Sequence, residues 1–360
     1  MKAVVLVGGE GTRLRPLTLS VPKQMLPIAE QPMIERVLGQ LRRHGVDEAV
    51  LSLGYLPDAF ALAYPDGVAA GVRLSYAVEP TPLDTAGAIR FAATAAGIEE
   101  TFIVVNGDVL TDMDFSALVD FHSRRGAEGS IGLHPVDDPS AFGVVPTAVD
   151  GRVTAFIEKP PRGQSPTNLI NAGVYVLEPS VLERIPEGCR VSIERETFPA
   201  MVADGSLYAL ADASYWIDTG TPEAYCDAQF DLLEGRRVSD GPPAPGARLV
   251  GPGIWEIGSV RVEGRIRGPV LIGDGTLIAP GASVSRSIVG PGCVVEAGAA
   301  VERSVVLGGA KIAQGASVVG SVIGGRAVLG ERCEVLPLSV VGFDAVVAPG
   351  SVLEGARVSA

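Results

Sequence analysis

The sequence predicts an α/β domain with a mixed, mostly parallel sheet, followed by a second domain built as a parallel β-helix. In the first 235 residues, apolar runs typical of buried strands alternate with amphipathic segments typical of helices. Proline, glycine and serine then gather in residues 239–246, and beyond them aliphatic residues and glycines recur at a short period. We therefore expect a first domain over residues 1–238, a linker over 239–247 and a β-helix over 248–360.

The composition narrows the class of protein. The chain has 360 residues, of which 47% are hydrophobic, so two domains with real cores are expected. A net charge of −13 argues against nucleic acid or an anionic membrane as a partner. No apolar run is long enough for a membrane span and the N-terminus has no signal-peptide pattern, which predicts a cytoplasmic protein. The four cysteines form no Cys-x-x-Cys pair, and we expect all four to be core thiols.

The first predicted strand, residues 2–7, runs directly into the glycine-rich stretch Gly8-Gly9-Glu10-Gly11. Glycines let backbone N–H groups approach a phosphate closely because they carry no Cβ atom. Arg13, Arg15 and Lys23 add positive charge in an otherwise acidic chain. The stretch therefore predicts a polyphosphate site. It is neither a P-loop, which needs Gly-Lys-Ser/Thr, nor a dinucleotide fingerprint, because Leu14 stands where that motif needs glycine.

The following elements predict a sheet covered on both faces. An amphipathic helix, two strands, an alanine-rich helix and a further strand are expected over 32–45, 48–53, 72–78, 85–96 and 102–105. Later strands are expected over 142–145, 156–160 and 171–177, and a helix over 192–203. In largely parallel sheets ligands bind at the carboxyl ends of the strands, where the glycine-rich stretch lies.

Two aspartates follow predicted strands. Asp108 comes shortly after the strand that ends at Val105, and Asp218 closes the short apolar run that begins at Trp216. Mg²⁺ prefers a few carboxylate oxygens together with substrate phosphate oxygens, so either residue suits part of such a site. The alternative is that each aspartate caps a turn or helix. For the helix expected near residue 222, Thr221 is the better cap.

The C-terminal repeat consists of aliphatic-Gly-x-Gly-like units at 249–253, 271–275, 288–292 and 340–344, with small residues near every sixth position. A period of six with one inward aliphatic residue per side makes a β-helix. The repeat is imperfect around residues 255–267. The sequence's histidines, His44, His122 and His134, all precede the repeat, which argues against a histidine-dependent acyltransferase there. Assembly or regulation is the better interpretation.

The N-terminal stretch Gly8-Gly9-Glu10-Gly11-Thr12-Arg13-Leu14-Arg15-Pro16-Leu17-Thr18, followed by Pro22-Lys23, resembles the signature of the sugar-phosphate nucleotidyltransferases. The resemblance implies a Rossmann-like nucleotidyltransferase domain followed by a left-handed parallel β-helix. Residues 171–175 and 216–218 resemble most the mannose-1-phosphate guanylyltransferase branch. That branch transfers GMP from GTP to mannose 1-phosphate, which yields GDP-mannose and pyrophosphate.

The resemblance also implies roles for single residues. The catalytic set would be Arg13, Lys23, Asp108 and Asp218, with Mg²⁺ held by the two aspartates. The nucleotide would contact Leu6, Gly8, Gly9, Gly11, Thr12, Arg13, Lys23, Glu79, Asp84 and Thr85. The sugar phosphate would contact Gly143, Glu158, Lys159 and Asn171. Taken alone, Glu158 and Lys159 would be interpreted as a solvated ion pair.

Glu79 is the candidate residue for recognising the base of the nucleotide. Guanine presents N1–H and N2–H₂ side by side, and one carboxylate can accept both, whereas uracil and thymine offer a single N3–H flanked by acceptors. Asp84 stands where the family usually has glycine. Aspartate tolerates a left-handed backbone better than most residues, so the loop can keep its shape. Its carboxylate could reinforce guanine recognition or disturb the usual contact.

Two alternatives stay open. The chain could use glucose 1-phosphate or another sugar phosphate with GTP, dTTP or UTP. It could also be a non-catalytic regulatory subunit that senses a nucleotide sugar, although the complete set Arg13, Lys23, Asp108 and Asp218 favours an enzyme. From the aliphatic sides of the β-helix and from the family resemblance we expect a homo-oligomer.

Overall fold

The computed structural model describes residues 1–237 and 242–360, so the predicted linker over 239–247 lies partly outside the described residues. The chain forms two compact units. One contains Met1–Glu10 and Ile34–Trp216, and the other contains Gly11–Met33 and Ile217–Ala360. The second unit therefore combines most of the basic N-terminal stretch, Asp218 and the whole C-terminal repeat.

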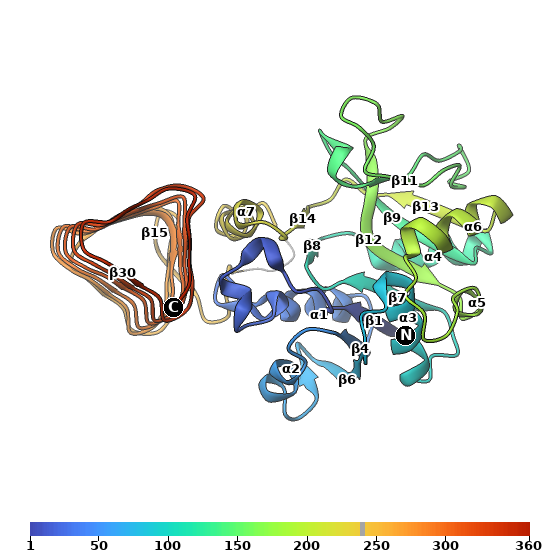
Figure 1. Cartoon of the computed structure of the whole chain (residues 1–360), viewed down its shortest axis with the longest axis horizontal. Helices are drawn as coiled ribbons and strands as arrows, with labels where there is room; N and C mark the ends of the chain where they lie inside the picture. Colours follow the sequence, from blue (N-terminus) through green and yellow to red (C-terminus); the bar gives the residue numbers. More distant parts are fainter. Residues whose placement is uncertain (238–241) are drawn as a thin grey trace. The chain divides into compact units, whose positions relative to one another are not determined.

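The first unit is built on a ten-stranded mixed sheet (Figure 1). At its centre β1 (Lys2–Leu6) pairs in parallel with β7 (Phe102–Asn106) and with β4 (Glu48–Leu53), which pairs in parallel with β6 (Val72–Val78). β12 (Leu169–Leu177) runs antiparallel to β7. The other strands of the sheet are β5 (Val68–Ala69), β9 (Gly129–Pro135), β10 (Gly143–Val144), β11 (Ile157–Glu158) and β13 (Leu207–Ala211). The predicted α/β class with a mixed, mostly parallel sheet is confirmed.

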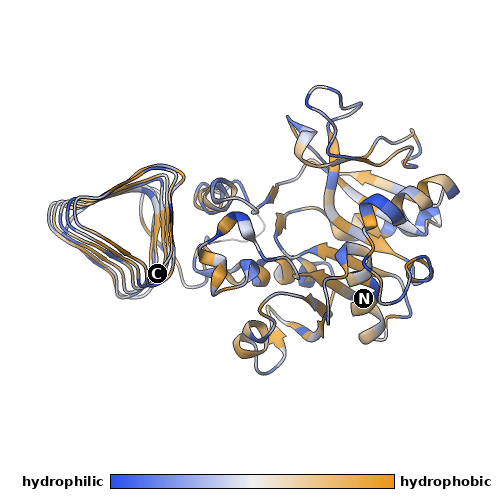
Figure 2. Cartoon of the chain, viewed as in Figure 1, coloured by the Kyte–Doolittle hydropathy of each residue, from blue (hydrophilic) through white to orange (hydrophobic). Residues whose placement is uncertain are grey.

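Helices pack on this sheet through apolar faces, and Figure 2 shows its strands as largely hydrophobic. They are α1 (Met33–Arg43), α2 (Asp58–Ala63), α3 (Asp84–Ala95), α4 (Phe115–Arg125), α5 (Ser180–Glu183) and α6 (Phe198–Asp204). The helix predicted over 192–203 is divided: a π-helical turn, Ile193–Thr197, precedes α6. Pro199 in the first turn of α6 has no amide hydrogen to donate, which interrupts the regular α-helical bonding.

In the second unit, residues 11–33 fold against one helix. They contain short 3₁₀ turns at Thr12–Leu14, Leu17–Leu19 and Lys23–Met25, and the hairpin of β2 (Pro27–Ile28) and β3 (Gln31–Pro32). After β14 (Trp216–Asp218), the helix α7 (Pro222–Leu233) begins at the predicted cap, because the Thr221 hydroxyl accepts from the Ala224 amide at 3.2 Å. The Tyr225 hydroxyl donates to the Pro27 carbonyl at 2.5 Å, so α7 holds the hairpin.

The repeat forms a parallel β-helix whose stacked coils outline a triangle (Figure 1), in agreement with the predicted fold. Successive coils are offset by 16 to 18 residues, as in the pairs Arg261 with Leu277, Val294 with Lys311 and Val328 with Val346. The first coil is irregular, as expected: β15 (Arg248–Gly251) runs antiparallel to β16 (Ile254–Glu256). The long strands are β18 (Arg265–Ile272) and β20 (Ser283–Val289).

Short strands complete the coils. They are β17 (Arg261–Val262), β19 (Leu277–Ile278), β21 (Val294–Val295), β22 (Ala300–Glu302), β23 (Val305–Val306), β24 (Lys311–Ile312), β25 (Ser317–Val319), β26 (Val322–Ile323), β27 (Val328–Leu329), β28 (Glu334–Val335), β29 (Val340–Val341), β30 (Val346–Val347), β31 (Val352–Leu353) and β32 (Arg357–Val358). One inward aliphatic residue from each side fills the interior.

The cysteines differ in burial, which corrects the expectation that all four are core thiols. Cys226, Cys293 and Cys333 are buried, as predicted, but Cys189 is exposed in the loop before the π-helical turn. The prediction that all four are core thiols is therefore wrong for Cys189. Among the described residues, no helix combines the length and the apolar character that a membrane crossing requires.

Candidate active site

In the second unit, the basic stretch is shaped by Gly11. Its φ of +60° lies in the left-handed region, and a Cβ atom there would lie 3.0 Å from Thr18 Cγ2 and 3.1 Å from Lys23 Cβ. The Thr18 hydroxyl donates to the Gly11 carbonyl at 2.9 Å, which closes the loop. This position therefore requires glycine for its backbone conformation and for the close approach of Thr18 and Lys23.

Three of the four predicted catalytic residues converge in this unit. Lys23 is only 4% exposed, and its Nζ lies 3.9 Å from Asp218 Oδ1, which also accepts from the Gly220 amide at 2.8 Å. A methyl group built on Gly220 would overlap the Arg13 guanidinium and lie 2.8 Å from Asp218 Oδ1. Gly220 therefore makes the space in which Arg13 and Asp218 meet. Sequence reasoning gave Gly220 no role, although a glycine two residues after a strand end was a signal.

The fourth residue, Asp108, lies in the first unit, two residues beyond β7. The Gly107 amide donates to the Leu6 carbonyl at 2.9 Å, which ties the ends of β7 and β1 together. Within the described residues, no group of three or more His, Cys, Asp or Glu side chains could hold a metal ion by itself. The aspartates offer hard oxygen ligands, and Mg²⁺ usually takes one or two carboxylates and completes its shell with water and phosphate oxygens. The donor chemistry therefore fits Mg²⁺.

Glu79, the predicted base reader, is held in place just beyond β6. Its Oε1 accepts from the Ser52 hydroxyl at 3.1 Å and its Oε2 from the Leu83 amide at 3.0 Å. A Cβ atom on Gly8 would lie 3.3 Å from Glu79 Oε1, so the carboxylate lies beside the glycine-rich stretch. A Cβ atom on Gly9 would meet nothing within 4 Å. The structure thus brings predicted nucleotide-binding residues together, and Ser52 is a supporting residue that the sequence did not single out.

Asp84 opens α3 with a φ of +60°, the left-handed backbone that aspartate was expected to tolerate here. Its Oδ1 accepts from the Thr85 amide at 2.9 Å. Its Oδ2 lies 3.2 Å from Arg195 Nη2 and 3.7 Å from Arg190 Nε. Two arginines therefore offset the negative charge of this additional carboxylate.

Thr85 connects the same loop to the π-helical turn. Its hydroxyl donates to Glu194 Oε2 at 2.8 Å and accepts from the Ile193 amide at 2.8 Å. Glu194 and Arg195 therefore contact two predicted nucleotide-binding residues, a long-range pairing that no local sequence pattern indicates.

The predicted sugar contact Asn171 is oriented by a bulge in β12. The pairing of β12 with β9 shifts register between Asn171 and Tyr175, and Gly173 between them has a φ of +71°. Asn171 Oδ1 accepts from the Gly173 amide at 3.0 Å, and Asn171 Nδ2 donates to the Tyr175 hydroxyl at 2.9 Å. A Cβ atom on Gly173 would lie 2.6 Å from Asn106 Nδ2, so the bulge needs glycine.

Tyr175, the hydrogen-bond partner of Asn171, is influenced by the charges of further predicted site residues. Its hydroxyl is fully buried, and burial raises its pKa well above the usual value. The negative charges of Glu194, Glu158 and Asp108 raise the pKa of Tyr175 further. Sequence reasoning quoted Tyr175 only as part of a motif. Its role as the partner of Asn171 depends on the bulge.

Gly143 and Glu158 lie on neighbouring strands, and Lys159 directly follows Glu158. β10 pairs with β11 so that Gly143 faces Glu158, and a Cβ atom on Gly143 would lie 2.8 Å from the Phe156 ring. Lys159 Nζ lies 3.3 Å from Glu158 Oε1, and the lysine side chain is 65% exposed. These two side chains form the ion pair considered for them. The pair remains open to solvent, and a phosphate can approach the ammonium group.

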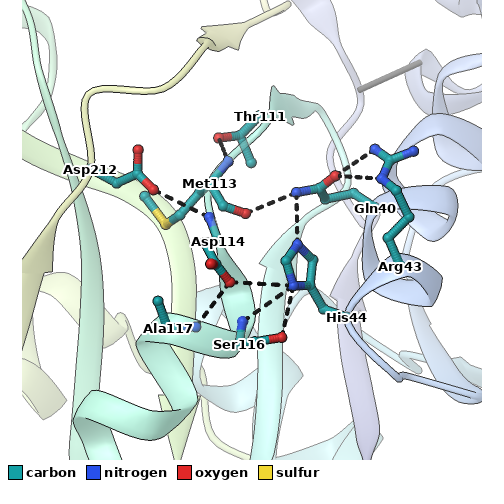
Figure 3. Close-up of polar contacts among 9 residues, drawn as sticks. All are labelled: Gln40, Arg43, His44, Thr111, Met113, Asp114, Ser116, Ala117 and Asp212. Atoms are coloured by element: carbon teal, nitrogen blue, oxygen red, sulfur yellow. Dashed lines mark hydrogen bonds and ion pairs between the residues drawn. The ribbon is translucent and has the colours of Figure 1, made fainter. Parts of the chain in front are cut away.

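A separate network at His44 has the residue types of a hydrolase triad but not its geometry (Figure 3). The Ser116 hydroxyl lies 2.9 Å and Asp114 Oδ1 lies 3.5 Å from the same ring nitrogen, Nδ1. His44 Nε2 faces Gln40 Nε2 at 3.3 Å. A triad needs the hydroxyl and the carboxylate on opposite ring nitrogens. Asp114 instead caps α4 by accepting from the Ala117 amide at 2.9 Å, so this network is structural.

Comparison with known sequences assigns both parts of the chain. Residues 2–235 match the family described as nucleotidyl transferase, and residues 266–360 match the GMPPB C-terminal domain. A mannose-1-phosphate guanylyltransferase of Mycobacterium tuberculosis is 43% identical over 300 residues, which cover 78% of this chain and 80% of that protein. A mannose-1-phosphate guanylyltransferase of Arabidopsis thaliana is 38% identical over 292 residues, covering 79% and 80%.

Solved structures share the fold over 63% of the chain. HddC from Yersinia pseudotuberculosis superposes with a TM-score of 0.56 at 30% identity, covering 63% of this chain and 97% of HddC. The structure of HddC complexed with GMP-PN superposes with a TM-score of 0.55 and the same identity and coverage.

Proposed function

Because the chain belongs to the nucleotidyl transferase family, we propose that it transfers GMP from GTP to mannose 1-phosphate, forming GDP-mannose and releasing pyrophosphate. The observation that carries the proposal is the convergence of Arg13, Lys23 and Asp218 around Gly220. The names of the relatives support the choice of substrates. Within this class of enzyme, the alternatives are glucose 1-phosphate or another sugar phosphate in place of mannose 1-phosphate, and dTTP or UTP in place of GTP.

The proposed reaction needs no covalent intermediate. A phosphate oxygen of the sugar 1-phosphate attacks the α-phosphorus of GTP, and the bond from that phosphorus to the β-phosphate bridging oxygen breaks. The nucleophile is already an anion near neutral pH, so no general base is required. The barrier lies in bringing anions together and stabilising the leaving group, which is electrostatic work. Arg13 and Lys23 hold the departing pyrophosphate, and Lys159 holds the incoming sugar phosphate.

Enzymes of this family generally use a divalent metal ion. We propose Mg²⁺, with Asp108 and Asp218 as its protein ligands. The two aspartates belong to different compact units, so this assignment depends on the sequence motif and on the donor chemistry. When bound, the ion withdraws charge from the phosphate oxygens and orients them. The Lys23 ammonium group, 3.9 Å from Asp218 Oδ1, orients that carboxylate.

Glu79 supplies the proposed preference for guanine. Its carboxylate lies beside Gly8, and the Ser52 and Leu83 donors use only part of its acceptor capacity. The two carboxylate oxygens can still accept from guanine N1–H and N2–H₂. Asp84 does not compete for the base in this arrangement, because its oxygens face Thr85, Arg190 and Arg195.

A non-catalytic sensor of nucleotide sugars is the alternative from another class. Such a subunit has no need for the complete set of Arg13, Lys23, Asp108 and Asp218, and the relatives named as transferases favour the enzyme. We further propose that the protein works as a homo-oligomer formed through the β-helix. The cytoplasmic location expected from the sequence stays a prediction.

The deciding experiment measures pyrophosphate release with Mg²⁺ for GTP, dTTP, UTP, ATP and CTP against mannose 1-phosphate and glucose 1-phosphate. We expect a clear preference for GTP with mannose 1-phosphate. In Glu79→Gln the KM for GTP should rise, because an amide presents a donor to guanine's donors. Preference for another pair would redirect the substrate assignment but keep the reaction class. No turnover with any pair would support the sensor.

Variants of the catalytic set separate enzyme from sensor. We expect Asp108→Ala and Lys23→Ala to lower kcat by at least about a hundredfold with the fold retained, because each removes charge that acts on the reacting phosphates. Asp120→Ala, an exposed aspartate on α4, is the matched control and should keep full activity. Unchanged turnover in both site variants would overturn the assignment of roles.

A further inference from the structure

One outward side of the β-helix is buried. Strand pairing aligns five aliphatic residues, one per coil, which we name the outer aliphatic row: Leu271, Ile288, Val305, Val322 and Val340. Their neighbours in sequence, among them Ile272, Val289 and Val306, belong to the interior core. Successive side chains of a strand point to opposite faces, so the row points out of the β-helix. Each of its residues is nevertheless no more than 1% exposed.

The outward positions of the other two sides are different. On the side of β21, β24, β27 and β30, Lys311 is exposed, Val328 is 37% exposed and Val346 is 70% exposed. On the side of β25, β28 and β31, Glu334 is exposed and Val352 is 63% exposed. Burial of the outer aliphatic row is therefore not a general property of the coils. Other residues of the chain cover it.

Segments next to the predicted phosphate-binding side chains contact this side of the β-helix near both ends of the row. At one end of the row, α7 packs on β18 and β20. There the Arg286 guanidinium lies 5.5 Å from the centre of the Phe230 ring and 3.0 Å from Glu234 Oε1. At the other end, a Cβ atom on Gly342, which follows β29, would lie 3.1 Å from Pro16 Cγ.

These covering segments are directly connected to the site. Pro16 lies in sequence between Arg13 and Lys23. The helix α7 begins four residues after Asp218, and its Gln229 Oε1 accepts from the Ala29 amide at 3.0 Å in the hairpin that follows Lys23. Movement of either support would displace charged groups whose positions decide how well pyrophosphate is held.

We propose that the outer aliphatic row of the β-helix positions Arg13, Lys23 and Asp218 for the departure of pyrophosphate. The β-helix is then part of the support of the active site, in addition to any role in assembly. Its five row residues touch no substrate, and they act through Pro16 and α7 as positioning residues. This inference depends on the proposed function, which assigns the contact with pyrophosphate to Arg13 and Lys23 of the second compact unit.

The test removes methyl groups from the row and measures each substrate separately. The variant carries Val305→Ala and Val322→Ala, and its matched control carries Val294→Ala and Val328→Ala, at outward positions of another side. In the reverse reaction we expect the row variant to raise the KM for pyrophosphate at least about fivefold and to lower kcat. In the forward reaction the KM for mannose 1-phosphate should change less than about twofold. The proposed sugar-phosphate contacts Glu158, Lys159 and Asn171 belong to the other compact unit. The control should match the wild type.

Further measurements separate positioning from simple loss of structure. Partial unfolding lowers kcat through the active fraction and leaves the KM for pyrophosphate unchanged, so that result would overturn the proposal. Val322→Ile, which keeps the row filled, should retain the wild-type KM, and Val322→Ala alone should shift it in the same direction as the double variant. The mass by light scattering should not change, because the row is buried within one chain. A wild type without turnover on any substrate pair would instead contradict the proposed function.

Discussion

Glu30 is a single residue that should make the stability of the protein depend on pH. It occupies the turn between β2 and β3, where Ala29 and Glu30 have φ values of 46° and 65°, the left-handed pair typical of a tight hairpin turn. Desolvation raises the pKa of its carboxyl from 4.5 to about 7. Burial raises the pKa of the Tyr225 hydroxyl and of the Cys293 thiol, and the negative charge of Glu30 raises both further.

This shift predicts a stability that falls as the pH rises. Between pH 4.5 and about 7 the folded chain keeps a proton on Glu30 that the unfolded chain has released, so the free energy of unfolding decreases across that window. Glu30→Gln should remove this dependence and stabilise the protein at pH 8 by up to about 3 kcal/mol. Urea unfolding at pH 5 and pH 8 measures it, with the exposed Glu99→Gln as control. Parallel pH profiles for wild type and Glu30→Gln would show that the prediction is wrong.

At the scale of the element, the bulge in β12 decides the position of the sugar contact. A regular strand would point Asn171 and Gly173 to the same face. With Gly173 at a φ of +71°, the Gly173 amide instead donates to Asn171 Oδ1, and the Asn171 amide group reaches Tyr175. Bulges that re-aim a side chain are common next to active sites.

Gly173→Ala tests this geometry. A methyl group there would meet Asn106, so the bulge must move and Asn171 with it, and we expect the KM for the sugar 1-phosphate to rise. Gly163→Ala is a matched control, because Gly163 has a φ of +75° and nothing within 4 Å of its Cβ position. Both variants should lose about 1 kcal/mol of stability through the positive φ. An equal effect of the two variants on KM would argue against a role for the bulge.

For the whole molecule, the exposed aliphatic residues identify where copies of the chain could meet. The outer aliphatic row is already covered, whereas Val346 and Val352 are 70% and 63% exposed on the terminal strands β30 and β31. Unpaired strand edges with aliphatic side chains favour association. The proposed homo-oligomer therefore should form through the last coils rather than through the covered side.

Light scattering at micromolar concentration measures this association. We expect a mass above the 37.2 kDa of one chain. A double variant with Val346→Lys and Val352→Lys should return it to one chain, because the paired charges would be buried at a cost. Val149→Lys, at a fully exposed position outside the β-helix, should leave the mass unchanged. A wild type with the mass of a single chain would refute the proposed oligomer.

The sequence by itself determined the class of fold and most candidate residues. The glycine-rich stretch, the strands that end near Asp108 and Asp218, and the short period of the repeat are local signals, because they reflect backbone geometry over a few residues. Even the left-handed conformation at Asp84 could be anticipated from the residue type and the family pattern. The missed helix division at Pro199 was a local signal as well.

Only the tertiary structure decided how distant segments support these residues. The hydrogen bond of Thr85 with Glu194, the electrostatic influence of three carboxylates on Tyr175, and the close approach of Gly220 to Arg13 join positions far apart in the chain. The burial of the outer aliphatic row belongs to the same group. Alternation along a strand shows which residues point outward, but it contains no information on what covers them, because burial depends on long-range packing.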